Sequence, residues 1–171
     1  MDWLPREMPL LSGSLEQDYD DLHEVFKRDF VESEVYYEGK KVYYRTSIDR
    51  TTFDGKYCVG FTHLVTRKNG GQRIIDYGRA RRLPWVRAII EHADDPAVVV
   101  LEKISFVPRR GAVRNTYLWL EEKDFLVILS CKIDDGGAGE DGQLIVTAYT
   151  ITESYMRRDL ESLRREQEGG E

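Results

Sequence analysis

A histidine and a run of basic residues lie close together near the middle of the chain, and these side chains suit the chemistry of a phosphodiester. The segment 61–85 reads FTHLVTRKNGGQRIIDYGRARRLPW and holds one histidine, five arginines and one lysine. An imidazole can accept or return a proton, and guanidinium groups can hold phosphate oxygens and stabilise a pentacoordinate phosphorane. The candidate phosphate-site residues are His63, Arg73, Arg79 and Arg82.

The charge of the chain is unevenly distributed around this segment. The formal net charge is -6, yet residues 67–87 hold seven bases against the single acid Asp76, whereas residues 1–38 hold eleven acids against three bases. A local basic field attracts phosphate groups, while the acidic remainder keeps the protein away from bulk nucleic acid. Asp76 could pair with one of the arginines and fix its rotamer. The alternative is a solvated arginine face on a helix.

Two hydroxyl side chains near the C-terminal end could complete such a site. In the segment IVTAYT, the alternation of a strand places Thr147 and Tyr149 on one face, where both could donate to a phosphate or a base. Each candidate also has a structural alternative. Thr and Tyr suit an ordinary pleated sheet. His63, between Phe61 and Val65 on one face of a predicted strand, could be a core-edge histidine bonded to a backbone carbonyl.

Several common signatures are absent from the sequence. It has no glycine-rich phosphate loop ending in Lys-Ser or Lys-Thr, no GxGxxG, no GxSxG and no HExxH. The three histidines, His23, His63 and His92, are too scattered to suggest a metal site, so we expect neither a metal nor a cofactor. Cys58 and Cys131 lie far apart in apolar runs, which is typical of reduced core thiols.

The chain also lacks the signals of export or membrane insertion. The opening MDWLPREMPLLSG has no basic region followed by a long apolar run, and nowhere do 18 apolar residues follow one another. We therefore expect a cytoplasmic protein with no membrane partner.

Hydrophobic periodicity and turn residues predict the elements that must position these side chains. Ser14 is a candidate helix N-cap, the Glu38–Lys40 turn indicates a hairpin, and residues 68–71 form another turn. The predicted helices span 14–31, 79–93 and 153–168, and the further predicted strands span 56–66, 97–107, 114–121, 125–133 and 143–151. Pro84 indicates that the regular part of the middle helix begins there. The glycine-rich segment 134–142 is expected to be a flexible loop without chemistry.

The order of these elements favours the α+β class. At 171 residues the chain is the size of one domain. Four consecutive, short-linked strands predict an antiparallel meander with helices packed on one side, preceded by an N-terminal helix and hairpin. We divide the chain into an acidic extension at 1–55 and a main domain at 56–171.

The ordered motifs resemble a known family. The series GFTHLVTR, RIIDYGRARRLPWVRAII, DFLVILSC and LIVTAYTI is similar to phage- and mobile-element-associated members of the barnase-EndoU-colicin-RelE ribonuclease superfamily, the BECR or RelE-like domains. In that pattern Phe-x-His-Leu precedes Arg-x-Pro-Asp-x-x-Arg-x-x-Arg-Ile-x-Trp, and the sheet closes with Thr-Ala-Tyr. This chain has Ile75 in place of the proline and Leu83 in place of the isoleucine, and the resemblance covers about residues 60–156.

The resemblance implies a four-stranded antiparallel sheet after one or two helices and, for residues 56–171, a RelE-like nuclease-type domain. It implies metal-free RNA cleavage in which the ribose 2′-hydroxyl attacks the adjacent phosphate and leaves a 2′,3′-cyclic phosphate. The implied catalytic residues are His63, Arg79, Arg82 and Tyr149, and the implied substrate-binding residues are Arg73, Trp85 and Thr147. The implied partners are tRNA or mRNA, free or ribosome-bound, and an antitoxin or immunity protein.

Two other interpretations remain open. The chain could be a non-catalytic RNA- or protein-binding module of a phage or mobile element, because its acidic first 38 residues could cover the basic segment in cis or recruit a basic partner. It could also be a structural protein with an arginine-studded helix.

Overall fold

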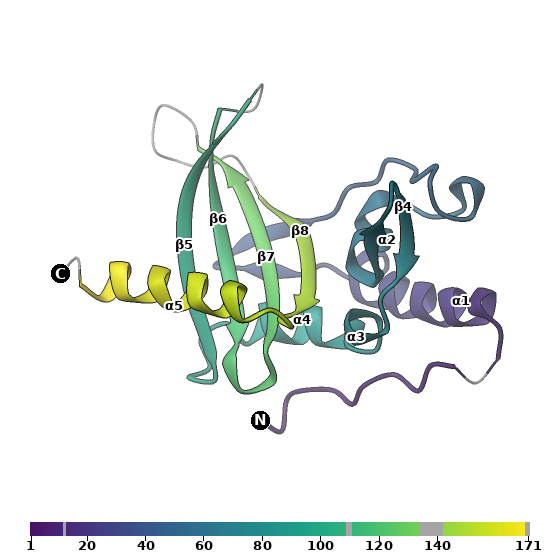
Figure 1. The fold of residues 1–171 in the computed structure, drawn as a ribbon, viewed down its shortest axis with the longest axis horizontal. Helices are drawn as coiled ribbons and strands as arrows, with labels where there is room; N and C mark the ends of the chain where they lie inside the picture. The colour runs from purple at the N-terminus through teal and green to yellow at the C-terminus, as the bar shows by residue number, and fades with distance from the viewer. Residues whose placement is uncertain (12, 109–110, 134–141, 170–171) are drawn as a thin grey trace.

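A curled sheet forms the centre of the molecule (Figure 1). The structure, a computed structural model, describes residues 1–11, 13–108, 111–133 and 142–169. The strands of this sheet are β1 (Tyr36–Tyr37), β2 (Lys40–Tyr43), β5 (Val98–Val107), β6 (Gly111–Leu120), β7 (Phe125–Lys132) and β8 (Gln143–Thr150). They lie in the order β1-β2-β8-β7-β6-β5, and every neighbouring pair is antiparallel except β2 with β8.

The predicted α+β class and the four-stranded antiparallel meander are confirmed, whereas the predicted size of the sheet is wrong. The N-terminal hairpin adds two further strands, because β2 pairs in parallel with the start of β8 at Val42 and Gln143. Parallel pairing needs no turn residues between its strands, so local sequence patterns do not reveal it. The hairpin at Glu38 is confirmed, with Glu38 and Gly39 both at positive φ.

Helices cover both faces of the sheet, so the prediction of helices on one side is also wrong. Helix α5 (Ser154–Glu168) crosses one face, where Leu160 packs with Trp119 and Leu126. On the other face α4 (Leu83–Glu91) packs with Leu118 and residues of α1 in the larger core. Successive residues of β6 are buried on both sides, since Leu118 and Trp119 are each 0% exposed, and both faces therefore need a covering layer.

The N-terminal helix forms as predicted. Helix α1 (Leu15–Phe26) continues as a π-helix, η1 (Lys27–Val31), and together they match the predicted span 14–31. The hydroxyl of Ser14 accepts a hydrogen bond from the backbone N–H of Gln17, as expected of an N-cap.

The segment that contains His63 is a helix, and the prediction of a strand at 56–66 is wrong. Helix α2 spans Val59–Val65, and Phe61, Leu64 and Val65 are almost fully buried. Spacings of three and four residues place all three on one helical face, although the β-branched and aromatic composition favoured a strand. A short 3-10 turn, η2 (Phe53–Gly55), precedes α2.

Two short strands and a short helix connect α2 to α4. The hairpin of β3 (Thr66–Asn69) and β4 (Gln72–Ile75) turns at Gly70 and Gly71, both at positive φ, so the predicted turn is confirmed. The predicted helix at 79–93 is divided into α3 (Tyr77–Ala80) and α4, and Pro84 lies in the first turn of α4 as expected.

Two remaining predictions concern the loop and the C-terminal helix. Most of the predicted loop at 134–142 lies outside the described residues, which resume at Gly142. The predicted helix at 153–168 is confirmed as α5, whose Arg157 and Arg164 lie over the Trp119 ring at 5.4 and 5.0 Å.

Within the described part of the chain, no helix combines the length and the apolar character needed to cross a membrane.

Candidate functional site

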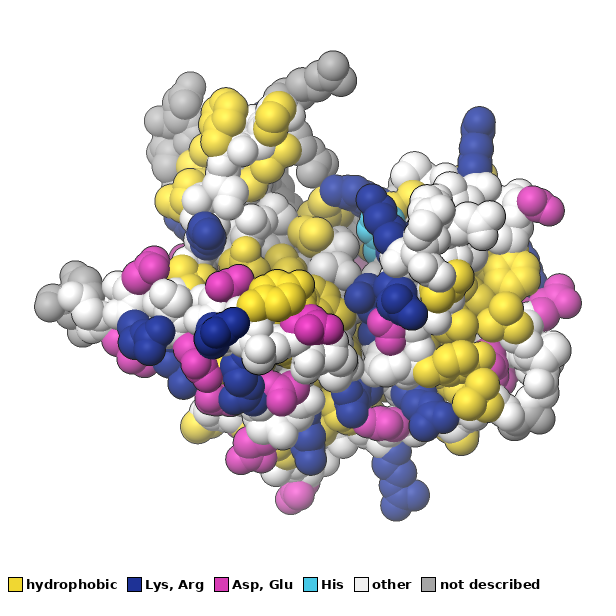
Figure 2. Space-filling view, in the orientation of Figure 1, with side chains coloured by type: hydrophobic (Ala, Val, Ile, Leu, Met, Phe, Trp, Pro, Cys, Tyr) yellow, Lys and Arg dark blue, Asp and Glu magenta, His cyan; other side chains and the backbone are white. Residues whose placement is uncertain are grey.

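The candidate site lies where α2 and α3 meet the edge of β8. Strand β8 pairs with β2 only at Gln143 and Leu144, and α2 and α3 contact the strand beyond that point. Figure 2 shows Lys and Arg side chains gathered over α2, α3 and the β3–β4 hairpin, beside the hollow that separates them from the sheet. The basic segment of the sequence therefore forms one face of this junction.

His63 presents a neutral imidazole to this basic surface. Burial, together with the charges of Arg73 and Arg45, lowers its pKa to about 4, and the charge of Asp49 opposes this shift. Among the described residues, none forms a hydrogen bond with the imidazole. At neutral pH the ring is therefore uncharged and retains a nitrogen that can accept a proton.

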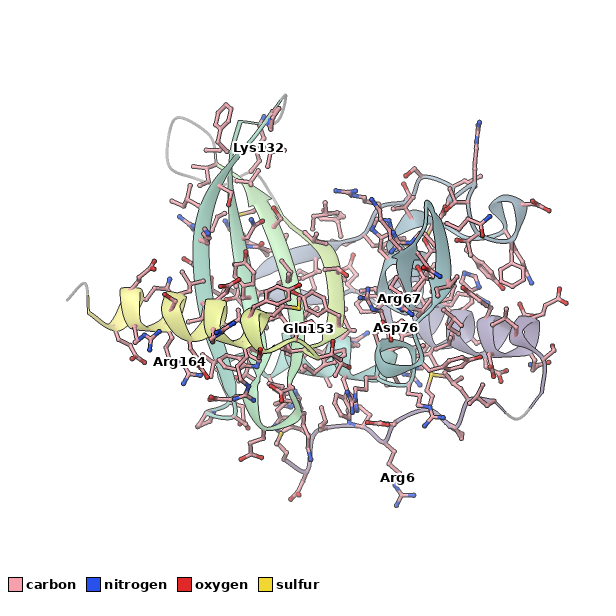
Figure 3. The ribbon with its side chains drawn as sticks, viewed as in Figure 1. Arg6, Arg67, Asp76, Lys132, Glu153 and Arg164 are labelled. Carbon is pink, nitrogen blue, oxygen red and sulfur yellow. The ribbon has the colours of Figure 1, made fainter. Side chains whose placement is uncertain are left out.

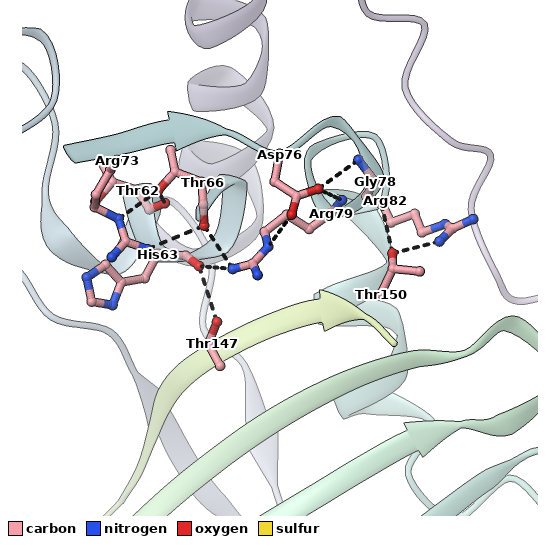
Figure 4. Close-up of polar contacts among 10 residues, drawn as sticks. All are labelled: Thr62, His63, Thr66, Arg73, Asp76, Gly78, Arg79, Arg82, Thr147 and Thr150. Carbon is pink, nitrogen blue, oxygen red and sulfur yellow. Dashed lines mark hydrogen bonds and ion pairs between the residues drawn. The ribbon is translucent and has the colours of Figure 1, made fainter. Parts of the chain in front are cut away.

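Arginines hold the C-terminal end of α2 in place (Figure 4). The Arg79 guanidinium donates to the Thr66 carbonyl at 2.8 Å and to the His63 carbonyl at 3.4 Å. Arg73 donates through Nε to the Thr66 hydroxyl at 2.7 Å and through Nη2 to the Thr66 carbonyl at 3.3 Å. The Thr147 hydroxyl also donates to the His63 carbonyl, at 3.3 Å. Cations at a helix C-terminus complement its unpaired carbonyls and its dipole, so these arginines stabilise α2.

Asp76 orients Arg79, as the sequence predicted for one of the arginines. Its carboxylate forms an ion pair with Arg79 at 3.4 Å and accepts hydrogen bonds from the backbone N–H groups of Gly78 and Arg79, which caps α3. Burial lowers the pKa of Arg79, and the charge of Asp76 opposes this effect. The buried Nε of Arg79 is the atom that faces Asp76 Oδ2 in this ion pair, although it makes no hydrogen bond within the described part of the chain.

Tyr149 lies against the Arg79 guanidinium. The centre of the Arg79 guanidinium is 5.6 Å from the centroid of the Tyr149 ring. Burial raises the pKa of Tyr149, Tyr117 raises it further, and Arg79 opposes them. The phenol therefore keeps its proton at neutral pH and can donate it.

Arg82 and Trp85 lie further along β8, near its end at Thr150. Arg82 donates through Nε to the Glu7 carboxylate at 2.8 Å and through Nη1 to the Thr150 hydroxyl at 2.7 Å, and its guanidinium stacks 4.9 Å from the Trp85 ring. Trp85 is only 5% exposed, and its indole N–H donates to the Pro5 carbonyl at 2.8 Å. In this conformation Trp85 is a packing residue with no free face for a base.

The structure thus brings five of the seven predicted site residues into one connected group and places two beyond it. The connected group consists of His63, Arg73, Arg79, Thr147 and Tyr149. Arg82 and Trp85 form a separate contact at the end of β8.

Sequence reasoning missed the polar support beneath His63. The Asp49 carboxylate accepts hydrogen bonds from the Thr62 hydroxyl at 2.6 Å, the Thr51 hydroxyl at 2.6 Å and the Thr52 hydroxyl at 3.2 Å. Burial alone would raise the pKa of Asp49, but the hydrogen bonds from Thr51, Thr62 and Thr52 lower it to about 2. The run Asp-Arg-Thr-Thr at 49–52 is a turn signal that could have located this group.

Comparisons with known proteins yield no relative. No protein-family model, curated protein or solved structure matches the chain.

Among the described residues, no group of three or more His, Cys, Asp or Glu side chains is placed to hold a metal ion.

Proposed function

We propose that the protein is a metal-independent endoribonuclease whose site is the junction of α2, α3 and β8. The observation that carries this proposal is the His63 imidazole, which is neutral, lacks a hydrogen-bond partner among the described residues and lies in the field of Arg73 and Arg45. A base surrounded by cations suits an anionic substrate whose hydroxyl must lose a proton. The choice of RNA and the independence from metals follow from the resemblance to RelE-like ribonucleases.

On this proposal His63 is the general base. It removes the proton from the ribose 2′-hydroxyl while that oxygen forms a bond to the adjacent phosphorus and the bond from phosphorus to the 5′-oxygen breaks. A bound phosphate adds negative charge beside His63, which raises the pKa of the imidazole and improves it as a base. Tyr149, protonated at neutral pH, is the proposed donor to the departing 5′-oxygen.

The arginines have two roles in this scheme. Arg79 and Arg73 first fix the end of α2 through its carbonyls. The charge of Arg73 also acts on the His63 imidazole, where it would favour the extra negative charge of a phosphorane. Thr147 holds the His63 backbone, and we propose Arg73 and Thr147 as the groups that position the substrate phosphate.

The test is an incubation of purified protein with tRNA and with mRNA, free and ribosome-bound, in EDTA. We expect cleavage with 2′,3′-cyclic phosphate at the new ends. RNA carrying a 2′-deoxy residue at the cleaved position is the matched control, and we expect it to stay intact because the nucleophile is missing. Intact RNA in every arm would contradict the proposal.

A second candidate is a non-catalytic RNA- or protein-binding module with the same fold. The observation in its favour is that Arg73, Arg79 and Arg82 all donate to acceptors within the protein. The double variant His63→Ala, Arg79→Ala separates the two candidates. Loss of cleavage with retained fold supports the enzyme, whereas RNA binding by a wild type that never cleaves supports the module.

We also propose a protein partner, either an antitoxin or an immunity protein. The acidic segment 1–38 could recruit a basic antitoxin or immunity protein, or it could cover the basic surface itself. Co-purification with the product of a neighbouring gene would identify the first arrangement.

A further inference from the structure

The N-terminal strap, residues 1–11, runs beside α3 and α4 (Figure 1). Its Glu7 carboxylate contacts Arg82. The Met8 backbone N–H donates to the Arg81 carbonyl at 2.8 Å, and the Pro5 carbonyl accepts from the Trp85 indole at 2.8 Å. These bonds lie on either side of Glu7 in the sequence. The backbone on either side of Glu7 is therefore held against Arg81 and Trp85, which brings the Glu7 side chain within reach of Arg82.

A small open pocket lies where the strap meets α3. It has a volume of about 210 Å³ and is lined by Glu7, Tyr77, Gly78, Arg81 and Arg82. The two guanidinium groups outnumber the single carboxylate, so the pocket has a net positive lining. Figure 3 shows Arg6 extending from the strap away from the body of the protein, which adds a further cation on this side.

Arg81 differs from Arg82 in this lining, because it has no acidic partner within the described residues. Its Nε is buried without a hydrogen-bond partner, and no carboxylate among the described residues forms an ion pair with it. Arg82, by contrast, already binds Glu7 at 2.8 Å. The guanidinium fork accepts carboxylate and phosphate oxygens in the same geometry, so a phosphate group could take the place of the carboxylate.

The contact between Glu7 and Arg82 is suited to exchange. The two side chains are 40% and 23% exposed, and ion pairs in contact with water contribute little net stability. A phosphate group that binds both Arg81 and Arg82 would form one more ionic contact than the Glu7 carboxylate, which pairs with Arg82 alone.

We propose that Arg81 and Arg82 form a phosphate subsite that the Glu7 carboxylate occupies in the free protein and that a phosphate of bound RNA takes over. Thr147 contacts the His63 backbone and Thr150 contacts Arg82, so the two positions are three residues apart on β8, about 10 Å at the rise of a strand. The subsite would hold the RNA next to the cleaved bond. The identity of the ligand as RNA rests on the proposed function, whereas phosphate recognition rests on the pocket alone.

The test is the affinity of the full chain for a fluorescent 2′-O-methyl oligoribonucleotide, which cannot be cleaved, measured by anisotropy at several salt concentrations. We expect Glu7→Gln to tighten binding by about threefold, because a competing acid is removed. We expect Arg81→Gln to weaken binding by about tenfold and to lower the salt slope by about 1, because one phosphate contact is lost. Inorganic phosphate should compete with the oligonucleotide in wild type and less so in Arg81→Gln.

Matched controls remove the same charges elsewhere. Glu166→Gln and Arg158→Gln alter exposed residues of α5, far along the chain from the strap, and we expect neither to reproduce the effects. Circular dichroism checks that each variant is folded. Equal affinities for Glu7→Gln, Arg81→Gln and wild type, or no binding at all, would overturn the subsite, whether or not the protein cleaves RNA. The expected pattern without cleavage would uphold the subsite and contradict the proposed nuclease.

Discussion

The Thr147 hydroxyl on β8 donates a hydrogen bond to the backbone carbonyl of His63 on α2, over 3.3 Å. This bond joins segments 84 residues apart in the sequence and fixes the helix of the proposed base against the sheet. We predict that Thr147→Val, which keeps the shape and removes the hydroxyl, lowers the free energy of unfolding by about 1 kcal/mol and slows RNA cleavage. Thr147→Ser keeps the donor and should restore both. Urea unfolding gives the first quantity, and an unchanged midpoint in Thr147→Val would contradict the prediction.

We expect Arg79 to stabilise the fold, whether or not it also takes part in catalysis. Its guanidinium satisfies the carbonyls of His63 and Thr66, and its side chain is only 15% exposed. We predict that Arg79→Met lowers the free energy of unfolding by about 1 to 3 kcal/mol, because it removes one donor to each carbonyl and leaves the Asp76 carboxylate without its cation. Arg79→Lys keeps the positive charge but loses the planar guanidinium with its several donors. Its free energy of unfolding should lie between those of Arg79→Met and wild type. A loss below about 0.5 kcal/mol in Arg79→Met would show that the helix end does not depend on this contact.

The titration of His63 should be visible in the pH dependence of stability. Its pKa in the folded protein is about 4, against 6.5 for an ordinary histidine, so the unfolded chain binds more protons between these values. The stability contributed by neutral His63 is therefore complete above pH 6.5 and is lost as the pH falls towards 4, by about 1 to 3 kcal/mol. His63→Gln should flatten this part of the profile. An NMR titration measures the pKa directly, and a midpoint near 6.5 would refute the burial argument.

Asp49 provides a further test of the support beneath α2. Its carboxylate accepts from Thr51, Thr52 and Thr62, and Asp49→Asn replaces one acceptor oxygen by a donor. We predict a loss of about 2 kcal/mol at neutral pH in urea unfolding. In wild type this contribution should persist until the pH falls below 3.8 and disappear as it falls through about 2, because the pKa of Asp49 is lowered in the folded protein. Equal stability of Asp49→Asn and wild type would contradict this role.

The strands of the meander could be predicted because their signals are local. Strands β6 and β7 are rich in apolar, β-branched and aromatic residues and are joined by a short polar turn, and the predicted helix α5 follows β8. The strand predicted around His63 failed because Phe61, Leu64 and Val65 fit a buried strand by composition and a helix by spacing. The two periods cannot be separated over so short an apolar run.

The candidate site could be predicted in its residue types but not in its contacts. The basic segment and His63 are evident from the sequence, and Asp76 was expected to pair with an arginine, as it does with Arg79. That Arg79 would bind the carbonyls at the end of α2 could not be expected, because α2 itself was not predicted. The Glu7 contact with Arg82 spans 75 residues, and no local pattern encodes such a distance.

His63 is the proposed proton-transfer residue of metal-independent RNA cleavage. The most direct measurement is the single-turnover rate of RNA cleavage in EDTA for wild type, His63→Gln and the control His92→Gln, in which the changed histidine stacks on Trp3 away from the site. We predict that His63→Gln lowers the rate by about 10² to 10⁴ while the RNA affinity and the fold are retained, and that His92→Gln cleaves nearly as fast as wild type. Equal rates in His63→Gln and wild type would show that His63 is not the base.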